Sequence, residues 1–212
     1  MQEYLQHRHV FKFLKDIQES AIRAANIIKD MLNYSRRTSS SFVKASIGEL
    51  IDMALELARY DYDLRSSYDF NKIEVCREGD EDTEIQCDKV AIEQVLLNIL
   101  RNSAQAMISS RTMSTKSKIT IKTLDKGTTI QLEISDNGPG MNTEIEHKAF
   151  EPFFTTKPIG VGTGLGLSVT KFIITQKHHG TIKLYTSPQT GTRFVICLPK
   201  DGTSYVTEDF NC

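Results

Sequence analysis

The chain has 212 residues, of which 39 % are hydrophobic and 25 % are charged, and its formal net charge is −1. This balance indicates a globular domain with an additional element, and it argues against a protein built to bind bare nucleic acid or an anionic membrane. No apolar run approaches the ~20 residues of a membrane-spanning helix, and the polar start of the chain is unlike a secretory signal. Four dispersed cysteines without a CxxC pair predict reduced thiols in a cytoplasmic protein. They are Cys76, Cys87, Cys197 and Cys212.

A long amphipathic helix is predicted from about Val10 to Arg37. Apolar residues recur there in steps of three and four, the pattern of a helix seam, and no proline or glycine interrupts them. The apolar seam positions are Val10, Leu14, Ile17, Ala21, Ala24, Ile28 and Met31. The length and regular spacing favour a partner helix, in a dimer or a bundle, over packing on the chain's own core. The polar run Thr38 to Ser41 then predicts a linker.

Further helices are expected in the rest of the chain. Ser46 and Glu49 fit a capping box at the start of the first, and Asp88 is the expected N-cap of the second. Gly180 predicts the end of the third, because glycine tolerates the backbone geometry that ends a helix. The expected ranges are Ser46 to Arg59, Lys89 to Ile108 and Leu165 to Gln176.

Two β-hairpins are predicted from alternating apolar residues on either side of turn sequences. Their strands are Lys118 to Leu124 with Thr129 to Ser135, and Thr181 to Thr186 with Thr192 to Leu198. Short strands are also expected near Ile73, Val75 and Ile85. Hairpins separated by helices predict the α+β class: a two-layer α/β sandwich with a mixed, mostly antiparallel sheet, preceded by the long bundle or coiled-coil helix.

Glycine is concentrated between Asp136 and Leu167. Such a density suits backbone that approaches a ligand closely, and phosphate is the ligand that exposed N–H groups most often bind. The spacing matches neither the P-loop nor the dinucleotide-binding fingerprint. Asp136, at a strand end, is an acceptor for the amino group of a purine, and the hydroxyl of Thr192 on a neighbouring strand is placed to support it.

Asn98 and Asn102 are four residues apart on the predicted helix from Lys89 to Ile108, so they share one face. An amide oxygen is a hard, neutral ligand that Mg²⁺ accepts beside phosphates and water. Asparagine is otherwise mildly unfavourable within a helix. Two exposed polar residues remain the alternative for this pair taken alone.

Four segments together resemble the conserved boxes of sensor histidine kinases, and they occur in that family's order. The segments are Asn98-Ile99-Leu100-Arg101-Asn102-Ser103 (N box), Asp136-Asn137-Gly138-Pro139-Gly140 (first glycine box), Phe150 to Lys157 (F box) and Gly162-Thr163-Gly164-Leu165-Gly166-Leu167 (second glycine box). The resemblance covers about Phe42 to Lys200 as the ATP-binding catalytic domain. It also covers about Val10 to Arg37 as the second helix of the dimerisation and phosphotransfer bundle.

The resemblance implies a role for each matched position. Asn102 would bind Mg²⁺, with Asn98 one turn earlier, and both are the expected catalytic residues. Asp136 would bind the adenine amino group, with Thr192 near the ring. The segment between the glycine boxes would form a mobile lid. The other expected nucleotide-binding residues are Gly138, Gly140, Met141, Phe150, Thr155, Thr156, Lys157, Gly162, Thr163, Gly164, Leu165, Gly166 and Leu167.

The resemblance also implies a domain organisation and a reaction. Residues 1–41 would be a partial bundle helix with its linker, residues 42–200 the catalytic domain of Bergerat fold, and residues 201–212 a tail. With ATP and Mg²⁺ bound, the whole protein would transfer the γ-phosphoryl group to a histidine, for relay to an aspartate of a response-regulator receiver domain. A homodimer through the N-terminal helix is expected, without nucleic-acid or membrane contact by this fragment.

Two departures from the family pattern qualify this expectation. Neither His7 nor His9 is followed by an acidic residue, so the phosphoacceptor histidine is absent and the chain is expected to bind Mg-ATP without autophosphorylating. Gln105 stands three residues after Asn102, where many members carry a basic residue. Two alternatives remain: a MutL-like or chaperone-like ATPase of the same superfamily, and a non-catalytic nucleotide-binding dimerisation module. A glutamate base would stand at Asn98 in the first, which argues against it.

Overall fold

A computed structural model describes residues 10–14, 17, 20, 41–60, 70–109, 116–157, 162–204 and 206. The chain divides into two compact units: the larger comprises residues 40–148 and 169–212, and the smaller comprises residues 1–39 and 149–168. In the predicted N-terminal helix, residues 10–14, 17 and 20 are helical. The rest of that helix and linker residues 38–40 lie outside the described residues, so the bundle helix stays a prediction.

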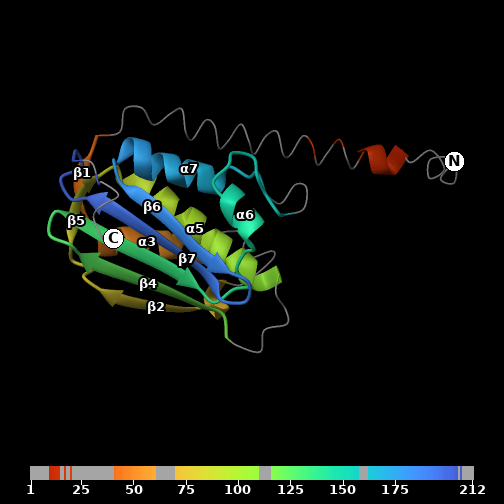
Figure 1. Cartoon of the computed structure of the whole chain (residues 1–212), viewed down its shortest axis with the longest axis horizontal. Coiled ribbons are helices and arrows are strands. Elements are labelled where there is room, and N and C mark those ends of the chain that lie inside the picture. The colour runs from red at the N-terminus through yellow and green to blue at the C-terminus, as the bar shows by residue number, and fades with distance from the viewer. Residues whose placement is uncertain are drawn as a thin grey trace. The chain divides into compact units, whose positions relative to one another are not determined.

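A mixed five-stranded sheet forms one layer of the larger unit, with the strand order β2-β4-β5-β7-β6 (Figure 1). The strands are β2 (Glu74–Gly79), β4 (Lys118–Asp125), β5 (Thr129–Asp136), β6 (Thr181–Ser187) and β7 (Gly191–Pro199). β2 pairs with β4 in parallel, and the other neighbours pair antiparallel. Both predicted hairpins, β4–β5 and β6–β7, are therefore confirmed.

β1 (Val43–Ser46) and β3 (Glu84–Cys87) form a separate two-stranded antiparallel sheet. The predicted capping role of Ser46 is wrong, because its hydroxyl donates to the backbone oxygen of Glu81 at 3.1 Å. The first helical amides are satisfied instead by backbone carbonyls. The Ile47 N–H donates to the oxygen of Thr83 at 3.0 Å, and the Gly48 N–H donates to that of Glu81 at 2.9 Å. Neither of these two amides needs a side-chain acceptor.

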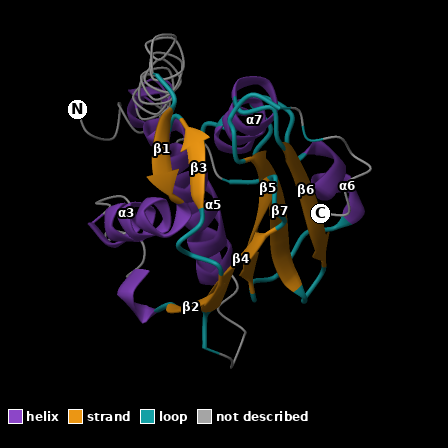
Figure 2. Ribbon diagram, turned by 90° about the vertical axis from the view of Figure 1, so that its left-hand side faces the viewer, coloured by secondary structure: helices purple, strands orange, loops and turns teal. Residues whose placement is uncertain are grey.

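Two long helices, α3 (Ile47–Tyr60) and α5 (Lys89–Ser109), contact each other beside the sheets (Figure 2). The predicted cap of α5 is confirmed, since Asp88 Oδ1 accepts the Ala91 N–H at 3.2 Å. Apolar side chains of the helices and strands make up the buried core. Its largest fully buried members are Ile47, Leu50, Ile51, Ile85, Ile92, Leu96, Ile99, Leu100, Ile119, Ile121 and Ile130.

The helix predicted from 165 to 176 changes its geometry midway. α7 (Gly166–Phe172) is α-helical, and a π-helical turn, η2 (Ile173–Lys177), follows it. The π turn lets the backbone N–H of His178 reach the oxygen of Ile173, at 3.1 Å. Three short elements were not predicted: β1, η1 (Phe70–Lys72) and α6 (Thr143–Lys148).

The cysteine prediction is correct in part. Cys76 and Cys87 are free thiols, but Cys197 is disulfide-bonded, so the expectation of reduced thiols is wrong for Cys197. Cys87 is buried, and this burial raises the pKa of its thiol to about 11. Among the described helices, none is long and apolar enough to cross a membrane.

Candidate functional site

Asp136 ends β5 with a buried carboxylate that is held by hydrogen bonds on both oxygens. The hydroxyl of Ser103, on α5, donates to Oδ2 at 2.8 Å. The backbone N–H groups of Gly138 and Thr192 donate to Oδ1 at 2.9 and 3.3 Å. Burial raises the pKa of the Asp136 carboxyl, and these three donors act in the opposite direction. The result is a carboxylate of fixed orientation that joins α5, β5 and β7.

A row of polar side chains extends from Asp136 across the sheet. Asp136 lies opposite Thr192 in the β5–β7 register, and Thr192 lies opposite Thr186 in the β7–β6 register. Directly opposed residues project from the same face of a sheet, so the three side chains share one face. The hydroxyls of Thr186 and Thr192 are 3.3 Å apart. The structure therefore brings together Asp136 and Thr192, the two residues that the sequence suggests for binding a purine.

The loop after Asp136 lies close against the β6–β7 hairpin. Gly140 has a φ of +67°, and a Cβ there would lie 2.0 Å from the backbone oxygen of Ser187, so no other residue fits without a shift of backbone. The Met141 N–H donates to the hydroxyl of Thr186 at 2.9 Å. A Cβ on Gly138 would lie 2.8 Å from Asp136 Oδ1. The absent Cβ atoms allow this loop to stay close to both the carboxylate and the hairpin.

Asn98 and Asn102 are half-buried on α5, one helical turn apart. The side-chain amide of Asn98 donates to the hydroxyl of Thr170, on α7, at 3.4 Å. Asn102 immediately precedes Ser103, whose hydroxyl donates to the Asp136 carboxylate. The same turn of α5 therefore carries both the asparagine and the donor to Asp136. Within the described part of the chain, no three His, Cys, Asp or Glu side chains are grouped to hold a metal ion. A cation here would need oxygen ligands from a bound anion and water, which fits Mg²⁺ beside phosphate.

The smaller unit contains the F box and the second glycine box, and the two pack against each other. A Cβ on Gly164 (φ +69°) would lie 2.4 Å from the carbonyl carbon of Phe153, which itself has a φ of 67°. A Cβ on Gly162 would lie 2.9 Å from Thr155 Oγ1 and 3.0 Å from Lys157 Cδ. Glycine at these positions therefore permits the close approach of two chain segments.

Local hydrogen bonds shape the same segments. Thr155 Oγ1 accepts the Lys157 N–H at 3.1 Å, and Thr163 Oγ1 accepts the Leu165 N–H at 3.3 Å. Such hydroxyl turns hold the chain in a bend. Residues 158–161 lie outside the described residues.

The expected site residues are therefore divided between the two units. The larger unit holds Asn98, Asn102, Asp136, Gly138, Gly140, Met141 and Thr192. The smaller unit holds Phe150, Thr155, Thr156, Lys157, Gly162, Thr163, Gly164, Leu165, Gly166 and Leu167. Two residues without an assigned role, Ser103 and Thr186, emerge as hydrogen-bond partners of this site. The sequence contains a signal that could have found Thr186: a turn over residues 187–191 places Thr186 opposite Thr192 in the hairpin.

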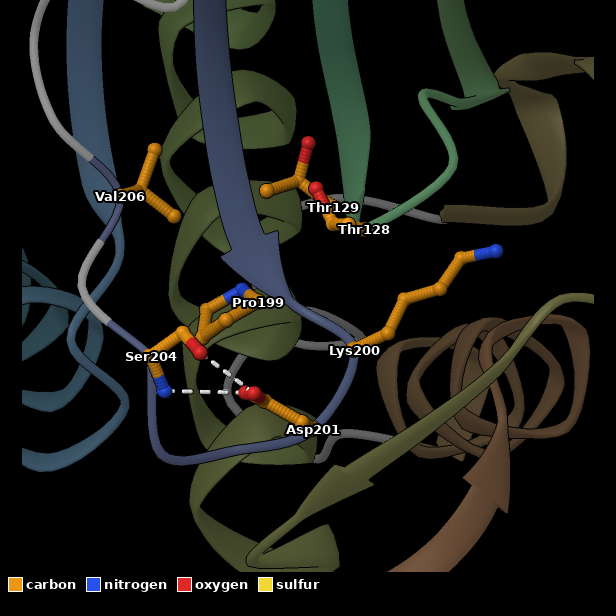
Figure 3. Close-up of a pocket in the computed structure, with 7 residues that line it drawn as sticks. All are labelled: Thr128, Thr129, Pro199, Lys200, Asp201, Ser204 and Val206. Carbon is orange, nitrogen blue, oxygen red and sulfur yellow. Dashed lines mark hydrogen bonds between the residues drawn. The ribbon is translucent and has the colours of Figure 1, made fainter.

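A cavity of about 330 Å³ lies at the far end of β5 and β7 from Asp136 (Figure 3). It is lined by Thr128, Thr129, Pro199, Lys200, Asp201, Ser204 and Val206. Hydrogen bonds from Ser204 and Thr203 lower the pKa of Asp201 to about 2. Thr129 pairs with Pro199 at one end of these strands, whereas Asp136 pairs with Thr192 at the other. This cavity is therefore separate from the candidate site.

Comparison with known families gives one match that covers more than half of the chain. A family model described as "Histidine kinase-, DNA gyrase B-, and HSP90-like ATPase" matches residues 87–202. Similar curated proteins include the signal transduction histidine-protein kinase AtoS of Escherichia coli, 34 % identical over 82 % of this chain. Sporulation kinase B of Bacillus subtilis is 31 % identical over 94 % of this chain. The matched regions are 26 % and 43 % of the lengths of these two relatives.

Solved structures of one histidine kinase, ThkA, are similar to this chain. Its catalytic domain is 31 % identical, with a TM-score of 0.61, and the match covers 76 % of this chain and 97 % of that domain. ThkA in complex with the response regulator protein TrrA is 29 % identical, with a TM-score of 0.66, over 90 % of this chain and 51 % of the other. The likeness extends from the sequence motifs to the arrangement of helices and strands.

Proposed function

We propose that Asp136 and Thr192 bind the adenine base of ATP in this chain, which belongs to the family of histidine kinase-, DNA gyrase B- and HSP90-like ATPases. The chain carries the ATP-binding catalytic domain of a sensor histidine kinase. The hydrogen-bonded carboxylate of Asp136 supports this assignment, because the donors from Ser103, Gly138 and Thr192 fix its orientation. A carboxylate accepts hydrogen bonds, and the exocyclic amino group of adenine donates them. Gly138, Gly140 and Met141 would then line the base through their backbone.

Asn102 would bind Mg²⁺ between the phosphates, with Asn98 as its neighbour on the same turn. The donor set supports this, since amide oxygens are ligands that Mg²⁺ accepts when phosphates and water complete its shell. When bound, Mg²⁺ would neutralise charge on the phosphates. The triphosphate would be wrapped by Gly162, Thr163, Gly164, Leu165, Gly166 and Leu167, with Phe150, Thr155, Thr156 and Lys157 from the F box. The glycine-dependent packing within this segment supports that assignment.

The reaction of the whole protein would be transfer of the γ-phosphoryl group of ATP to a histidine of the dimerisation and phosphotransfer bundle. In phosphoryl transfer of this kind, positioning and charge stabilisation make up most of the catalysis. A receiver-domain aspartate would take the group next, and ThkA, a similar kinase, has been solved with a response regulator. Residues 42–200 would be the catalytic domain of two-layer Bergerat fold, and residues 1–41 would join a homodimeric bundle.

The observation that carries the proposal is the carboxylate of Asp136 at the end of β5, which Ser103 holds from the same turn of α5 as Asn102. The test measures ATP affinity of the chain with and without Mg²⁺, for the wild type, Asp136→Asn and Asn102→Ala. Asp136→Asn should weaken ATP binding about tenfold or more, through loss of a charge-assisted hydrogen bond. Asn102→Ala should abolish the Mg²⁺ dependence of ATP binding. The control Gln94→Ala, which removes another side-chain amide from α5, should change neither the ATP affinity nor its Mg²⁺ dependence.

A second experiment separates kinase from ATPase. This chain is mixed with labelled ATP and a longer form of the protein that includes a histidine-bearing bundle helix. Acid-labile phosphate on the histidine is expected. Steady ATP hydrolysis without protein phosphorylation would favour a MutL-like or chaperone-like ATPase. Nucleotide binding without either reaction would favour the non-catalytic nucleotide-binding module, and absence of all nucleotide binding would overturn the proposal.

A further inference from the structure

The hydroxyl of Thr186 contacts three groups around the candidate base site. It lies 2.9 Å from the backbone N of Met141, 3.0 Å from the backbone O of Gly191 and 3.3 Å from Oγ1 of Thr192. Met141 belongs to the loop that follows Asp136, and Thr192 is opposite Asp136 in the sheet. Thr186 is half-buried on β6, the strand beside β7 (Figure 1).

Counting hydrogens assigns a direction to each of these bonds. A threonine hydroxyl has one hydrogen to donate and two lone pairs to accept with. The carbonyl of Gly191 has no hydrogen, so the Thr186 hydrogen goes to it. The Met141 N–H donates to one lone pair of Thr186, which leaves the other for Thr192. The Thr192 hydroxyl therefore donates to Thr186 and keeps only acceptor lone pairs for a ligand.

The consequence is a base site in which the two named side chains both accept. Asp136 accepts as a carboxylate, and Thr192 accepts because its hydrogen is engaged by Thr186. Adenine presents an amino group at its six position, whereas guanine presents a carbonyl oxygen there. A site made of acceptors suits the amino group and opposes the carbonyl oxygen.

We propose that Thr186 is a positioning residue that fixes the hydroxyl of Thr192 as an acceptor and so favours adenine over guanine nucleotides. This inference depends on the proposed function, because it assumes that Asp136 and Thr192 face the base. Thr186 itself does not need to touch the nucleotide. It acts through Thr192 and through the backbone of Met141.

The experiment compares the affinities of the chain for Mg-ATP and Mg-GTP in the wild type and in Thr186→Val, which keeps the shape but removes the hydroxyl. The valine variant loses all three hydrogen bonds of the Thr186 hydroxyl, so it should weaken ATP binding about tenfold and leave GTP binding close to the wild-type value. The GTP-to-ATP ratio of Kd values should fall accordingly. Thr186→Ser, which restores the hydroxyl, should restore both affinities.

The matched control is Thr190→Val in the turn of the same hairpin. Thr190 has a hydroxyl that bonds to Ser187, with Oγ1 3.0 Å from the Ser187 backbone oxygen, and none of the bonds described for it reaches the Asp136 loop. Loss of the Thr190 hydroxyl should leave the GTP-to-ATP ratio of Kd values unchanged. If Thr186→Val did not fold, Thr186→Cys would replace it, since a thiol of similar size is a poor acceptor and should lower the ratio in the same direction.

Two results would overturn the inference. Equal loss of ATP and GTP affinity, accompanied by a lower Tm, would show a structural role for Thr186 and no role in base choice. Wild-type affinities in Thr186→Val would show no role at all. A wild-type chain that bound neither nucleotide would overturn the proposed function itself, which the first two results would leave standing.

Discussion

Nε2 of His178 accepts a hydrogen bond from the backbone N–H of Asp88, 3.1 Å away and 90 residues earlier in the chain. The other ring nitrogen, Nδ1, lies 2.9 Å from the backbone oxygen of Ile173 and donates to it. The ring also stacks on Phe42 with a centroid distance of 4.9 Å. Both nitrogens are thus engaged in a way that only the neutral ring satisfies. His178 joins the end of η2 to the start of α5, the helix that carries Asn98 and Asn102.

Acidification should destabilise the larger unit through His178. Burial lowers the pKa of His178 below its ordinary value of 6.5. Because the folded pKa is lower than the unfolded one, the contribution of His178 is complete above about pH 6.5 and declines as the pH falls toward the folded pKa. Urea unfolding between pH 5 and pH 8, values chosen to bracket the ordinary histidine pKa of about 6.5, should show this loss.

The variant His178→Phe keeps a ring for Phe42 but leaves the Asp88 N–H without its acceptor. At pH 7.5 it should unfold more easily by about 1–3 kcal/mol, the cost of an unsatisfied buried donor. The difference from the wild type should shrink as the pH falls. His147→Gln, at an exposed position, should reproduce the wild-type profile. A difference that stays constant across this range would contradict the assignment.

Ser103→Ala should shift the pH dependence of ATP binding toward higher pH. Burial raises the pKa of Asp136, and the Ser103 hydroxyl opposes this by donating to the ionised form. Without that donor, the pKa of Asp136 rises further, so the acceptor is lost at a higher pH as the solution is acidified. The Kd for Mg-ATP should be measured over the acid range for both proteins.

The control for Ser103→Ala is Ser204→Ala. Ser204 also donates its hydroxyl to an aspartate, Asp201, but this pair lies at the cavity at the opposite end of β5 and β7. Its removal should leave the pH profile of ATP binding unchanged. Identical midpoints for the wild type and Ser103→Ala would indicate that Asp136 does not titrate in the binding reaction.

Gly140→Ala should destabilise the protein and weaken ATP binding together. Position 140 has a φ of +67°, and the added Cβ would meet the backbone oxygen of Ser187 at 2.0 Å. Gly127 has a φ of +82°, but nothing lies within 4 Å of a Cβ there. Gly127→Ala therefore isolates the cost of positive φ alone, about 1–2 kcal/mol.

The comparison uses urea unfolding and the Kd for Mg-ATP for both alanine variants. Gly140→Ala should lose more stability than Gly127→Ala, because the contact is with backbone that cannot rotate away. It should also bind ATP more weakly, whereas Gly127→Ala should bind it like the wild type. Equal losses in the two variants would show that the loop after Asp136 adapts to the extra atom.

Much of the candidate site could be predicted because its parts depend on local sequence. Asn98 and Asn102 share a face as a result of helix geometry, and Asp136 and Thr192 fall at the ends of strands that the hairpin turns define. The division of the expected site residues into two units could not be predicted, since it depends on tertiary packing. The N-terminal bundle helix stays a prediction, because most of it lies outside the described residues.

The wrong details share a physical cause: distant groups replaced local ones. Ser46 fits a capping box, yet carbonyls from the β2–β3 loop bind the first amides of α3, so its side chain bonds to Glu81 instead. The π turn η2 arises where His178 satisfies Ile173 and Asp88 at once. The hairpin register places Thr186 opposite Thr192, but its bond to the Met141 N–H depends on a loop 45 residues earlier in the chain. The spacing of residue types along the sequence does not predict these long-range hydrogen-bond partners.

Arg77→Met should loosen the start of α3. The guanidinium of Arg77 binds Glu81 with two hydrogen bonds, Nε to Oε1 at 2.7 Å and Nη2 to Oε2 at 2.8 Å, and Nη1 binds Asp52 of α3. The backbone oxygen of Glu81 in turn accepts the Gly48 N–H. A bidentate arginine is among the stronger ion pairs, so its loss should cost about 1–3 kcal/mol in urea unfolding.

A matched surface pair distinguishes this effect from loss of any ion pair. Lys44 and Glu84 are bridged with side chains 63 % and 52 % exposed, compared with 24 % for Arg77. Lys44→Met should therefore cost only about 0–1 kcal/mol. Hydrogen exchange should also separate the variants: the Gly48 amide should exchange faster in Arg77→Met alone, because its acceptor is on the loop that Arg77 holds. Unchanged exchange at Gly48 would mean that β1–β3 pairing, rather than Arg77, fixes the position of Glu81.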